Sequence, residues 1–263
     1  RAPRPPPDLN VRAFHNSSHE WSLANHPLHD DKPDKAAIGP GLDFALELRR
    51  RFKLAGRPQQ QVLLVPCAVG GSPIRRWSPG ADLYERALDS TRRALDSHAA
   101  RTGPCTIAGI LWHQGESDSG TAEAAASHAE ATRSALDALR RQLGAPDAAV
   151  VVGELGYFLD QAGDERFAHA AIVNAGLVNL PRALPHCATV SAHGLEHGGD
   201  RLHFSAVAAE AFGVRYADAW VRLAGEQFGL YVTEGEATAA LRPFSFPRGE
   251  SDPGCAASAA ILD

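Results

Sequence analysis

Short apolar runs alternate with amphipathic stretches along most of this chain, and no other feature of the sequence limits its fold as strongly. The apolar runs lie at residues 62–65, 107–112, 149–152 and 188–190. Continuous runs of this length are typical of strands that are buried on both faces. Stretches with helical spacing separate or follow them, at 42–55, 82–99, 122–143, 165–180 and after residue 205. This alternation predicts an α/β fold, a three-layer α/β/α sandwich around a central parallel sheet.

Local signals define the ends and faces of two of the predicted helices. Gly144 follows the stretch 122–143 and suits the left-handed conformation in which many helices end. Ser205 is a good N-cap for the last helix, because its hydroxyl can accept a hydrogen bond from a free backbone N–H. Helical spacing predicts that this last helix buries Val207, Ala211, Val214, Ala217 and Val221.

Proline, glycine and polar residues divide the chain into three parts. Residues 1–37 contain the stretch Arg4-Pro5-Pro6-Pro7 and a polar, histidine-rich segment, so we expect irregular backbone in which no core element begins. Residues 38–225 carry the alternating pattern and are expected to form one domain. Residues 226–263 are rich in Gly, Pro, Ser and Ala and predict a loosely structured tail. No internal repeat or second domain is expected.

Charge and composition exclude two classes of partner. The formal net charge is −5, from 31 Asp plus Glu against 26 Lys plus Arg, so no basic surface for nucleic acid is expected. No apolar run approaches the roughly 20 residues that cross a membrane, so a membrane is not an expected partner either. Four cysteines are spread singly and are expected to be mostly buried thiols: Cys67, Cys105, Cys187 and Cys255.

An aspartate three residues ahead of a histidine precedes the last predicted helix. In a tight turn, the carboxylate of Asp200 can reach Nδ1 of His203, which fixes the tautomer and leaves Nε2 free as a base. Ligand sites of open parallel sheets lie at the carboxyl ends of the strands. We therefore expect this pair in a site at that edge, where it can activate a hydroxyl.

Two other loops that follow predicted strands carry residues that a purely structural turn does not need. Residues 113–118 combine a histidine, an amide, a glycine and two acids. Gly70 and Gly71 follow the strand at 62–65, where glycine permits a sharp turn or a close approach to a ligand. A backbone N–H in this loop could donate to an oxyanion, and Gln114 could supply a second donor.

These segments resemble a known family of esterases. Residues 65–71, Trp77, 112–118 and 200–203 are similar to the sialate O-acetylesterase and carbohydrate esterase family 6 group of SGNH hydrolases, particularly its plant-type members. The likeness extends over about residues 20–225 and depends on the Gln-Gly-Glu and Asp-x-x-His motifs in this order. It implies a flavodoxin-like esterase domain over residues 38–225. It also implies removal of acetyl groups from acetylated sugars, xylan-like or sialic acid, with no metal or organic cofactor.

The resemblance also implies a role for each candidate residue. His203 would be the general base, Asp200 its orienting acid, and Gly71 and Gln114 the oxyanion donors. Glu116 would be the catalytic acid of the Gln-Gly-Glu motif. It would either assist the histidine or help to shape the site. Simpler readings stay open, since Gln114 could brace its loop through hydrogen bonds and Asp200 could stabilise the start of a helix.

The nucleophile implied by the resemblance is a serine in a Gly-Gln-Ser-Asn block after the first strand. The chain contains no such block, begins with Arg1 and has no methionine. We therefore expect a fragment whose first strand and nucleophile lie upstream, which leaves an exposed strand edge and no esterase activity. Ser72 and Ser117 lie in site loops but outside any Gly-x-Ser-x-Gly elbow, so both are expected to be turn residues. The compartment is not predicted.

Other functions compete with this one. A non-catalytic carbohydrate-binding or scaffold protein could keep the fold and have lost the nucleophile. A metal-dependent deacetylase would need ligands such as His193 and His197, but Gly194, Gly198 and Gly199 argue against a helix that aligns them. A phosphate-binding loop at residues 70–71 lacks both a third glycine at dinucleotide spacing and a Gly-Lys-Ser/Thr sequence.

Overall fold

A parallel β-sheet forms the centre of the protein. The computed structural model describes residues 7–29, 36–161 and 163–230, and the backbone of residues 256–262. Within these residues seven strands make one sheet in the order β2-β1-β3-β7-β4-β5-β6, and every neighbouring pair is parallel except β1 and β2. The strands are β1 (Val11–His15), β2 (Glu20–Leu23), β3 (Val62–Pro66), β4 (Cys105–Trp112), β5 (Ala149–Gly153), β6 (Cys187–Val190) and β7 (Ala256–Leu262).

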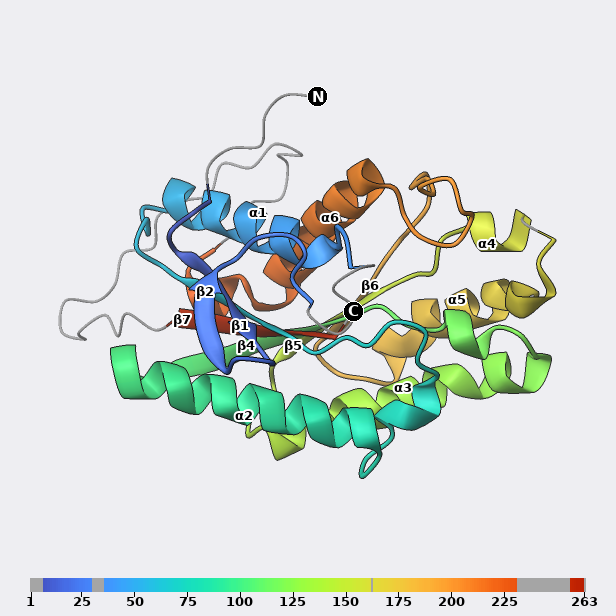
Figure 1. Ribbon diagram of the computed structural model, residues 1–263, viewed down its shortest axis with the longest axis horizontal. Coiled ribbons are helices and arrows are strands. Elements are labelled where there is room, and N and C mark those ends of the chain that lie inside the picture. The colour runs from blue at the N-terminus through green and yellow to red at the C-terminus, as the bar shows by residue number, and fades with distance from the viewer. Residues whose placement is uncertain (1–6, 30–35, 162, 231–255, 263) are drawn as a thin grey trace.

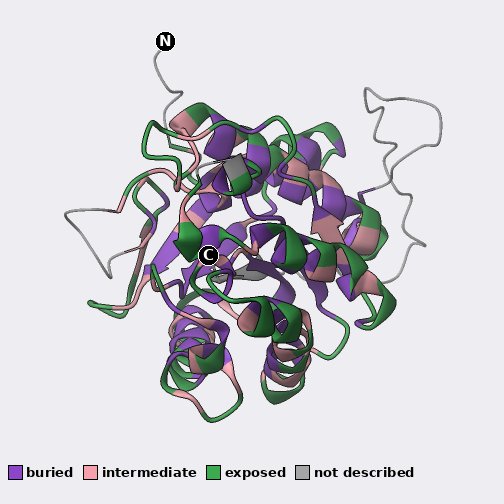
Figure 2. Cartoon of the chain, turned by 90° about the vertical axis from the view of Figure 1, so that its right-hand side faces the viewer, coloured by how far each residue is buried: buried purple, intermediate pink, exposed green. Residues whose placement is uncertain are grey.

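Helices cover both faces of this sheet, which confirms the predicted α/β fold. Figure 1 shows α1 (Pro40–Leu54) and α6 (Ala206–Ala224) above the sheet, with α2 (Asp82–Thr102) and α3 (Ala122–Gln142) below it. The helix α5 (Ala170–Asn179) lies on the same side as α3, and the short α4 (Phe158–Gln161) precedes it. Each layer has its own apolar cluster against the sheet. Figure 2 shows these buried residues on the inner sides of the helices and exposed residues on the outer sides.

Most of the predicted elements match the structure within a few residues. The four predicted strands correspond to β3, β4, β5 and β6, and the helices at 42–55, 82–99 and 122–143 correspond to α1, α2 and α3. Gly144 has φ +69°, as expected for a residue that ends a helix. The predicted helix at 165–180 is divided into the single turns η3 (Glu165–Phe167) and η4 (Leu180–Arg182) on either side of α5.

The expectation of irregular backbone throughout residues 1–37 is wrong for the part that the structure describes. Strand β1 pairs in parallel with β3, and β2 pairs antiparallel with β1. Val11, Ala13 and Phe14 are buried. The alternation that marks a strand runs over only five residues here and is flanked by polar residues, so periodicity alone did not reveal it. Residues 1–6 and 30–35 lie outside the described part.

Strand β7 replaces the loosely structured tail that we expected at the corresponding residues. It lies between β3 and β4, with Val62 opposite Ala257 and Trp112 opposite Leu262. The position expected to stand empty for a missing first strand is therefore filled, and β3 and β4 have no exposed edge there. Alanine is depleted in strands, so the stretch 256–262 gave no strand signal. The turn η5 (Glu226–Phe228) also falls in the predicted tail, whereas residues 231–255 lie outside the described part.

The N-cap predicted for the last helix is correct, whereas its predicted buried face is correct only for Ala217 and Val221, which are buried. The Ser205 hydroxyl accepts a hydrogen bond from the Ala208 backbone N–H. Val207 and Val214 are 65% and 40% exposed, and Ala211 is also exposed. The sheet side of α6 instead carries large aromatic residues four positions apart, and burying these removes more apolar surface from water than burying valines does. They are Phe212, Tyr216 and Trp220.

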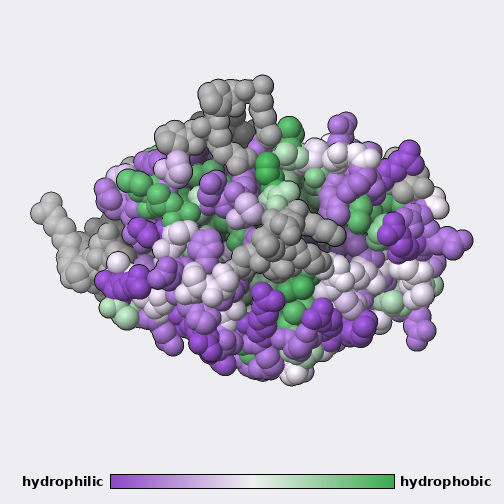
Figure 3. All heavy atoms as spheres, viewed as in Figure 1, coloured by the Kyte–Doolittle hydropathy of each residue, from purple (hydrophilic) through white to green (hydrophobic). Residues whose placement is uncertain are grey.

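Polar residues predominate on one face of the protein, seen in Figure 3, and apolar residues appear there in scattered patches. Among the described helices, none is long and apolar enough to cross a membrane. Cys67 and Cys187 are buried thiols, whereas Cys105 is partly exposed, and all three are free. Burial raises the pKa of the Cys67 thiol to about 12, so this thiol stays protonated at neutral pH.

Candidate active site

The predicted site residues all lie in loops at the carboxyl edge of the sheet. Parallel pairing brings the ends of β3, β4, β5 and β6 to this edge. Gly71 follows β3, Gln114 and Glu116 follow β4, and Asp200 and His203 follow β6. This is the edge where ligand sites of open parallel sheets are found.

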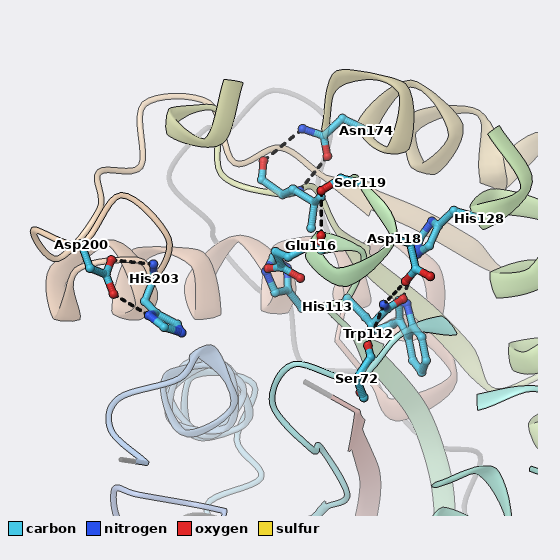
Figure 4. A network of polar contacts seen from close by, with 12 residues as sticks. Ser72, Trp112, His113, Glu116, Asp118, Ser119, His128, Asn174, Asp200 and His203 are labelled. Atoms are coloured by element: carbon cyan, nitrogen blue, oxygen red, sulfur yellow. Dashed lines mark hydrogen bonds and ion pairs between the residues drawn. The ribbon is translucent and has the colours of Figure 1, made fainter. Parts of the chain in front are cut away.

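Asp200 and His203 form the acid–histidine pair that their spacing predicts. Nδ1 of His203 lies 2.6 Å from Oδ2 of Asp200, and this leaves Nε2 outside the bond. Figure 4 shows the two side chains in contact. The other carboxylate oxygen accepts hydrogen bonds from the backbone N–H groups of Leu202 and His203, both at 2.9 Å. These bonds hold the turn in which Arg201 takes φ +58°. The hydrogen bond from His203 holds the pKa of Asp200 well below its usual range, so the acid is charged.

The Asp200–His203 pair is exposed, whereas the loop that carries it packs against the protein at Phe204, just after the pair. The His203 and Asp200 side chains are 76% and 51% exposed. The next residue, Phe204, contacts the rings of Phe158, Phe212 and His113 at centroid distances of 5.2, 5.2 and 5.6 Å. The histidine therefore lies in solvent beside a packed aromatic cluster.

Buried and half-buried polar residues fix the start of the same loop. Glu154, directly after β5, accepts hydrogen bonds from the Ala192 N–H and the Tyr157 hydroxyl, both at 3.1 Å. Arg215 of α6 donates to the carbonyls of Ser191 and His193. The loop from β6 to α6 is thus tied to the end of β5 and to α6.

Glu116 pairs with a histidine other than the candidate base. Its Oε1 lies 3.3 Å from Nε2 of His113. Burial raises the pKa of Glu116, but the hydrogen bond and the charge of His113, with smaller contributions from a backbone hydrogen bond and from His128, together outweigh it, and the net pKa is lowered. His113 in turn contacts the rings of Phe204 and Phe212. Glu116 therefore contacts residues that support the loop from β6 to α6. The carboxylate that contacts His203 is that of Asp200.

Gln114 belongs to a buried network that joins the loops after β3 and β4. Figure 4 labels Ser72, Asp118 and His128 of this network. Nε2 of Gln114 donates to the Ser72 carbonyl at 3.0 Å and to Oδ2 of Asp118 at 2.6 Å. Its Oε1 accepts from Nε2 of His128 at 2.8 Å. Because these two bonds use both amide protons, Gln114 has no free donor for an oxyanion in this arrangement. The contacts match the bracing role.

Asp118 and His128 complete this network. Oδ2 of Asp118 also accepts from the Ile74 backbone N–H at 2.9 Å, so it links η1 (Ile74–Trp77) to η2 (Glu116–Asp118). His128 lies on α3 and is fully buried. Burial lowers its pKa against the opposing charges of Asp118 and Glu116, so the ring is neutral.

Two glycines shape the loops that this network holds. Gly71 has φ +73°, a conformation that other residues adopt with strain. Gly115 has φ +147°, and a Cβ there would lie 2.7 Å from Cγ1 of Val173. The Gln-Gly-Glu motif therefore needs its glycine both for backbone conformation and for space against α5.

Ser72 and Ser117 differ in exposure, but neither contact pattern resembles that of a nucleophile beside a base. The Ser72 hydroxyl is buried and accepts a hydrogen bond from Nε1 of Trp77 at 2.9 Å. Trp77 is itself buried and packs edge-on against Trp112, so its ring does not face a ligand. Ser117 is exposed within η2. In the described part of the chain, no group of three or more His, Cys, Asp or Glu side chains could hold a metal ion.

Sequence reasoning gave Asp118 no role of its own and missed three polar residues that position this site: His128, Glu154 and Tyr216. The Tyr216 hydroxyl donates to the carbonyl of Trp112 at 2.8 Å and fixes α6 against the end of β4. Glu154 directly follows a predicted strand at the site edge, which was a usable signal. No spacing in the sequence links His128 to Gln114, because the two lie on different elements.

Two solved structures share this α/β sandwich. A solved Arabidopsis thaliana protein, AT4G34215, has a TM-score of 0.72 and 27% identity, covering 85% of this chain and 86% of that chain. The structure of XAC1771, described as a novel carbohydrate acetylesterase from Xanthomonas citri, has a TM-score of 0.58 and 20% identity. It covers 83% of this chain and 50% of that chain, and at this identity it supports the fold alone.

Sequence comparison defines the family. The chain belongs to the family described as "Carbohydrate esterase, sialic acid-specific acetylesterase", which matches residues 3–222. The Arabidopsis protein, named "Probable carbohydrate esterase At4g34215", is 28% identical over 206 residues, which are 76% of this chain and 71% of that protein. The resemblance inferred from the motifs, including its plant-type character, is confirmed.

Proposed function

We propose that this chain is the esterase domain of a serine-type carbohydrate O-acetylesterase in which His203 is the general base. The observation that carries the proposal is the 2.6 Å contact between His203 Nδ1 and Asp200 Oδ2 at the carboxyl edge of the sheet. A carboxylate on Nδ1 fixes the tautomer in which Nε2 accepts a proton, and it stabilises the imidazolium that then forms. Membership of a carbohydrate esterase family supports the same chemistry.

The reaction proceeds by two acyl transfers. Nε2 of His203 takes the proton of a serine hydroxyl while the serine oxygen bonds to the acetyl carbonyl carbon, which gives a tetrahedral oxyanion. The bond to the sugar oxygen then breaks, and that oxygen takes the proton from His203. Water attacks the acetyl-serine with His203 again as base, the serine regains its proton, and acetate leaves.

The backbone N–H of Gly71 is our candidate for binding the oxyanion. Within the described residues this N–H donates no hydrogen bond, and the loop that carries it is held through the Ser72 carbonyl by Gln114. Gln114 then acts on the reaction through the loop that it braces. Preorganised donors of this kind stabilise the transition state because they need no reorientation as charge develops.

The mechanism needs a serine hydroxyl at the carboxyl end of the strand between β3 and β4, beside Pro66 and Trp112. The strand in that position is β7. We assign the nucleophile to none of the described residues, because the Ser72 hydroxyl is buried against Trp77 and Ser117 lies in η2. The substrate class is an acetylated sugar, with an acetylated sialic acid and a xylan-like polysaccharide as the two candidates.

Acetate release together with active-site labelling tests the proposal. The purified chain would be incubated with an acetylated xylo-oligosaccharide, an O-acetylated sialic acid and a fluorophosphonate that labels reactive serines. Because no described residue supplies the nucleophile, residues 1–263 alone are expected to release no acetate. In a form that also carries the serine nucleophile, we expect acetate release from at least one substrate, lost in His203→Ala and retained in His193→Ala, an exposed histidine of the same loop. Equal turnover in His203→Ala would eliminate the proposed base. No turnover and no labelling in that form, but binding of the deacetylated sugars, would favour the non-catalytic carbohydrate-binding function.

A further inference from the structure

A second histidine, His197, lies at the base of the turn that carries the candidate acid–histidine pair. It has no role in the mechanism described above. An antiparallel bridge joins His197 to Phe204. Beside this bridge, the backbone N–H of Gly198 donates to the carbonyl of His203 at 2.8 Å. These contacts close a narrow loop over residues 198–203.

The tip of this loop adopts backbone conformations that a free chain rarely takes. Gly199 has φ +118° and Arg201 has φ +58°, and these two residues flank Asp200. A left-handed conformation costs free energy for a residue with a Cβ, such as arginine, so other contacts must hold it. All three residues are exposed. Burial therefore does not fix the backbone around Asp200, and hydrogen bonds have to do so.

The imidazole of His197 supplies an acceptor for both flanking residues. Its Nδ1 accepts hydrogen bonds from the backbone N–H of Gly199 at 2.9 Å and from that of Arg201 at 3.4 Å. A ring nitrogen that accepts carries no proton, so these bonds need the tautomer with its proton on Nε2. Oδ1 of Asp200 accepts from the next two backbone N–H groups of the turn. The two side chains thus divide the N–H groups of the turn between them.

The aromatic cluster beside the site fixes the position of the His197 ring. The ring of Phe158, in α4, lies 5.5 Å from it between centroids, at an interplanar angle of 70°. Phe158 is buried and also contacts Phe204, the residue after His203. His197 therefore connects the exposed turn to the packed part of the protein.

We propose that His197 is a positioning residue for the candidate base. Its Nδ1 holds the backbone on both sides of Asp200 and so keeps the Asp200 carboxylate on Nδ1 of His203. Without this acceptor the turn relaxes, and the 2.6 Å contact between acid and histidine is lost. The effect on turnover rests on the proposed esterase function, whereas the effect on Asp200 does not.

The ionisation of Asp200 tests the proposal without any catalysis. Carbon NMR of the carboxyl groups in residues 1–263 would follow Asp200 as pH falls, with its signal assigned from its absence in Asp200→Asn. The hydrogen bond from His203 holds the pKa of Asp200 well below its usual range, so this acid should stay ionised at about pH 3 in the wild type. His197→Phe keeps an aromatic ring against Phe158 but removes the acceptor, and the pKa of Asp200 should then rise toward about 3.9. An equally low Asp200 pKa in His197→Phe would overturn the proposal.

Two further variants separate the acceptor from the shape of the ring. His197→Asn places a side-chain oxygen where Nδ1 lies and should keep the low pKa of Asp200. His193→Phe, the same substitution at an exposed histidine of the same loop, should keep it as well. If His197→Asn behaves like His197→Phe, the hydrogen bonds to Nδ1 do not hold the turn and the proposal is wrong.

Kinetics of a form that also carries the serine nucleophile test the consequence for turnover. His197→Phe should lower kcat for an acetyl ester by about 10- to 10²-fold with little change in KM, because substrate still binds but the base is misplaced. In an Asp200→Asn background the same substitution should cost less than about twofold, since the carboxylate that His197 positions is already gone. An equal loss in both backgrounds would show that His197 does not act through Asp200, and would overturn the proposal. Absence of turnover in the wild type would count against the esterase function, and the Asp200 titration would still decide the role of His197.

Discussion

The Asp200–His203 turn and the Gln114 network hold polar groups at the same edge of the sheet in opposite ways. The turn is exposed, and its bonds join residues at most three positions apart. The network is buried, and its bonds join residues up to 44 positions apart, on three different elements. A group that exchanges protons with substrate needs solvent access and local orientation. The buried Gln114 network, which positions the loops around that group, needs contacts that also stabilise the fold. Substitutions in the two regions should therefore separate activity from stability.

The largest expected effect is on turnover and comes from the exposed turn. Asp200→Asn removes the carboxylate that fixes the His203 tautomer, so turnover of an acetyl ester should fall by about 10⁴-fold. The free energy of unfolding should change by less than about 0.5 kcal/mol, because the side chain is half exposed and the amide oxygen can still cap the turn. Steady-state kinetics and urea unfolding would measure the two quantities. Asp147→Asn, at an exposed loop position, is the control, and a greater loss of turnover in Glu116→Gln would reverse the roles of the two acids.

The next effect is on stability and comes from the centre of the network. Gln114→Ala leaves Asp118, His128 and the Ser72 carbonyl each without one partner. Unfolding should become easier by about 1–3 kcal/mol, the range for buried groups that lose their hydrogen bonds. Gln59→Ala, an exposed amide, should change the unfolding midpoint little. If Gln114→Ala instead unfolds like the wild type and turnover drops by about 10²- to 10³-fold, the amide is an oxyanion donor after all.

A smaller effect on stability is expected at His128, the buried α3 residue of the network. His128→Phe keeps an aromatic ring at this position but removes the N–H that donates to Oε1 of Gln114. It should lower the free energy of unfolding by roughly 1–2 kcal/mol. His128→Gln keeps an N–H that can reach the same acceptor and should recover part of this loss. Urea unfolding of both variants distinguishes hydrogen bonding from packing. Equal stability of the Phe and Gln variants would mean that the bond contributes nothing.

The smallest effect concerns pH and the second acid–histidine pair. The pKa of Glu116 in the folded protein is lowered from 4.5, so its contribution to stability is complete above pH 4.5 and is lost as pH falls below that value. Glu116→Gln should therefore flatten the dependence of the unfolding midpoint on pH below about pH 4.5. Glu123→Gln, at an exposed position on α3, is the control. Parallel curves for Glu116→Gln and the wild type would contradict the lowered pKa.

The sequence predicted the features that depend on residues close together in the chain. The apolar runs identified β3, β4, β5 and β6, and the Asp-x-x-His spacing identified a site contact made within a single turn. Contacts between distant elements gave no such signal. Two of the three partners of Gln114 come from the loop after β3 and from α3. The side of α6 that faces the sheet was decided by aromatic side chains whose partners lie on the strands.

The place of β7 in the sheet has a consequence for how the protein folds. Its neighbours on both sides are far from it in the chain, since Val62 pairs with Ala257 and Cys105 pairs with Ala256. Sheets that depend on such non-local pairings form slowly, because a long loop must close before any contact compensates for the lost chain entropy. Until β7 inserts, β3 and β4 each present an unpaired edge that can join a strand of another molecule. We therefore expect insertion of the central strand to be the slow step of folding and the moment at which the protein is most prone to aggregate.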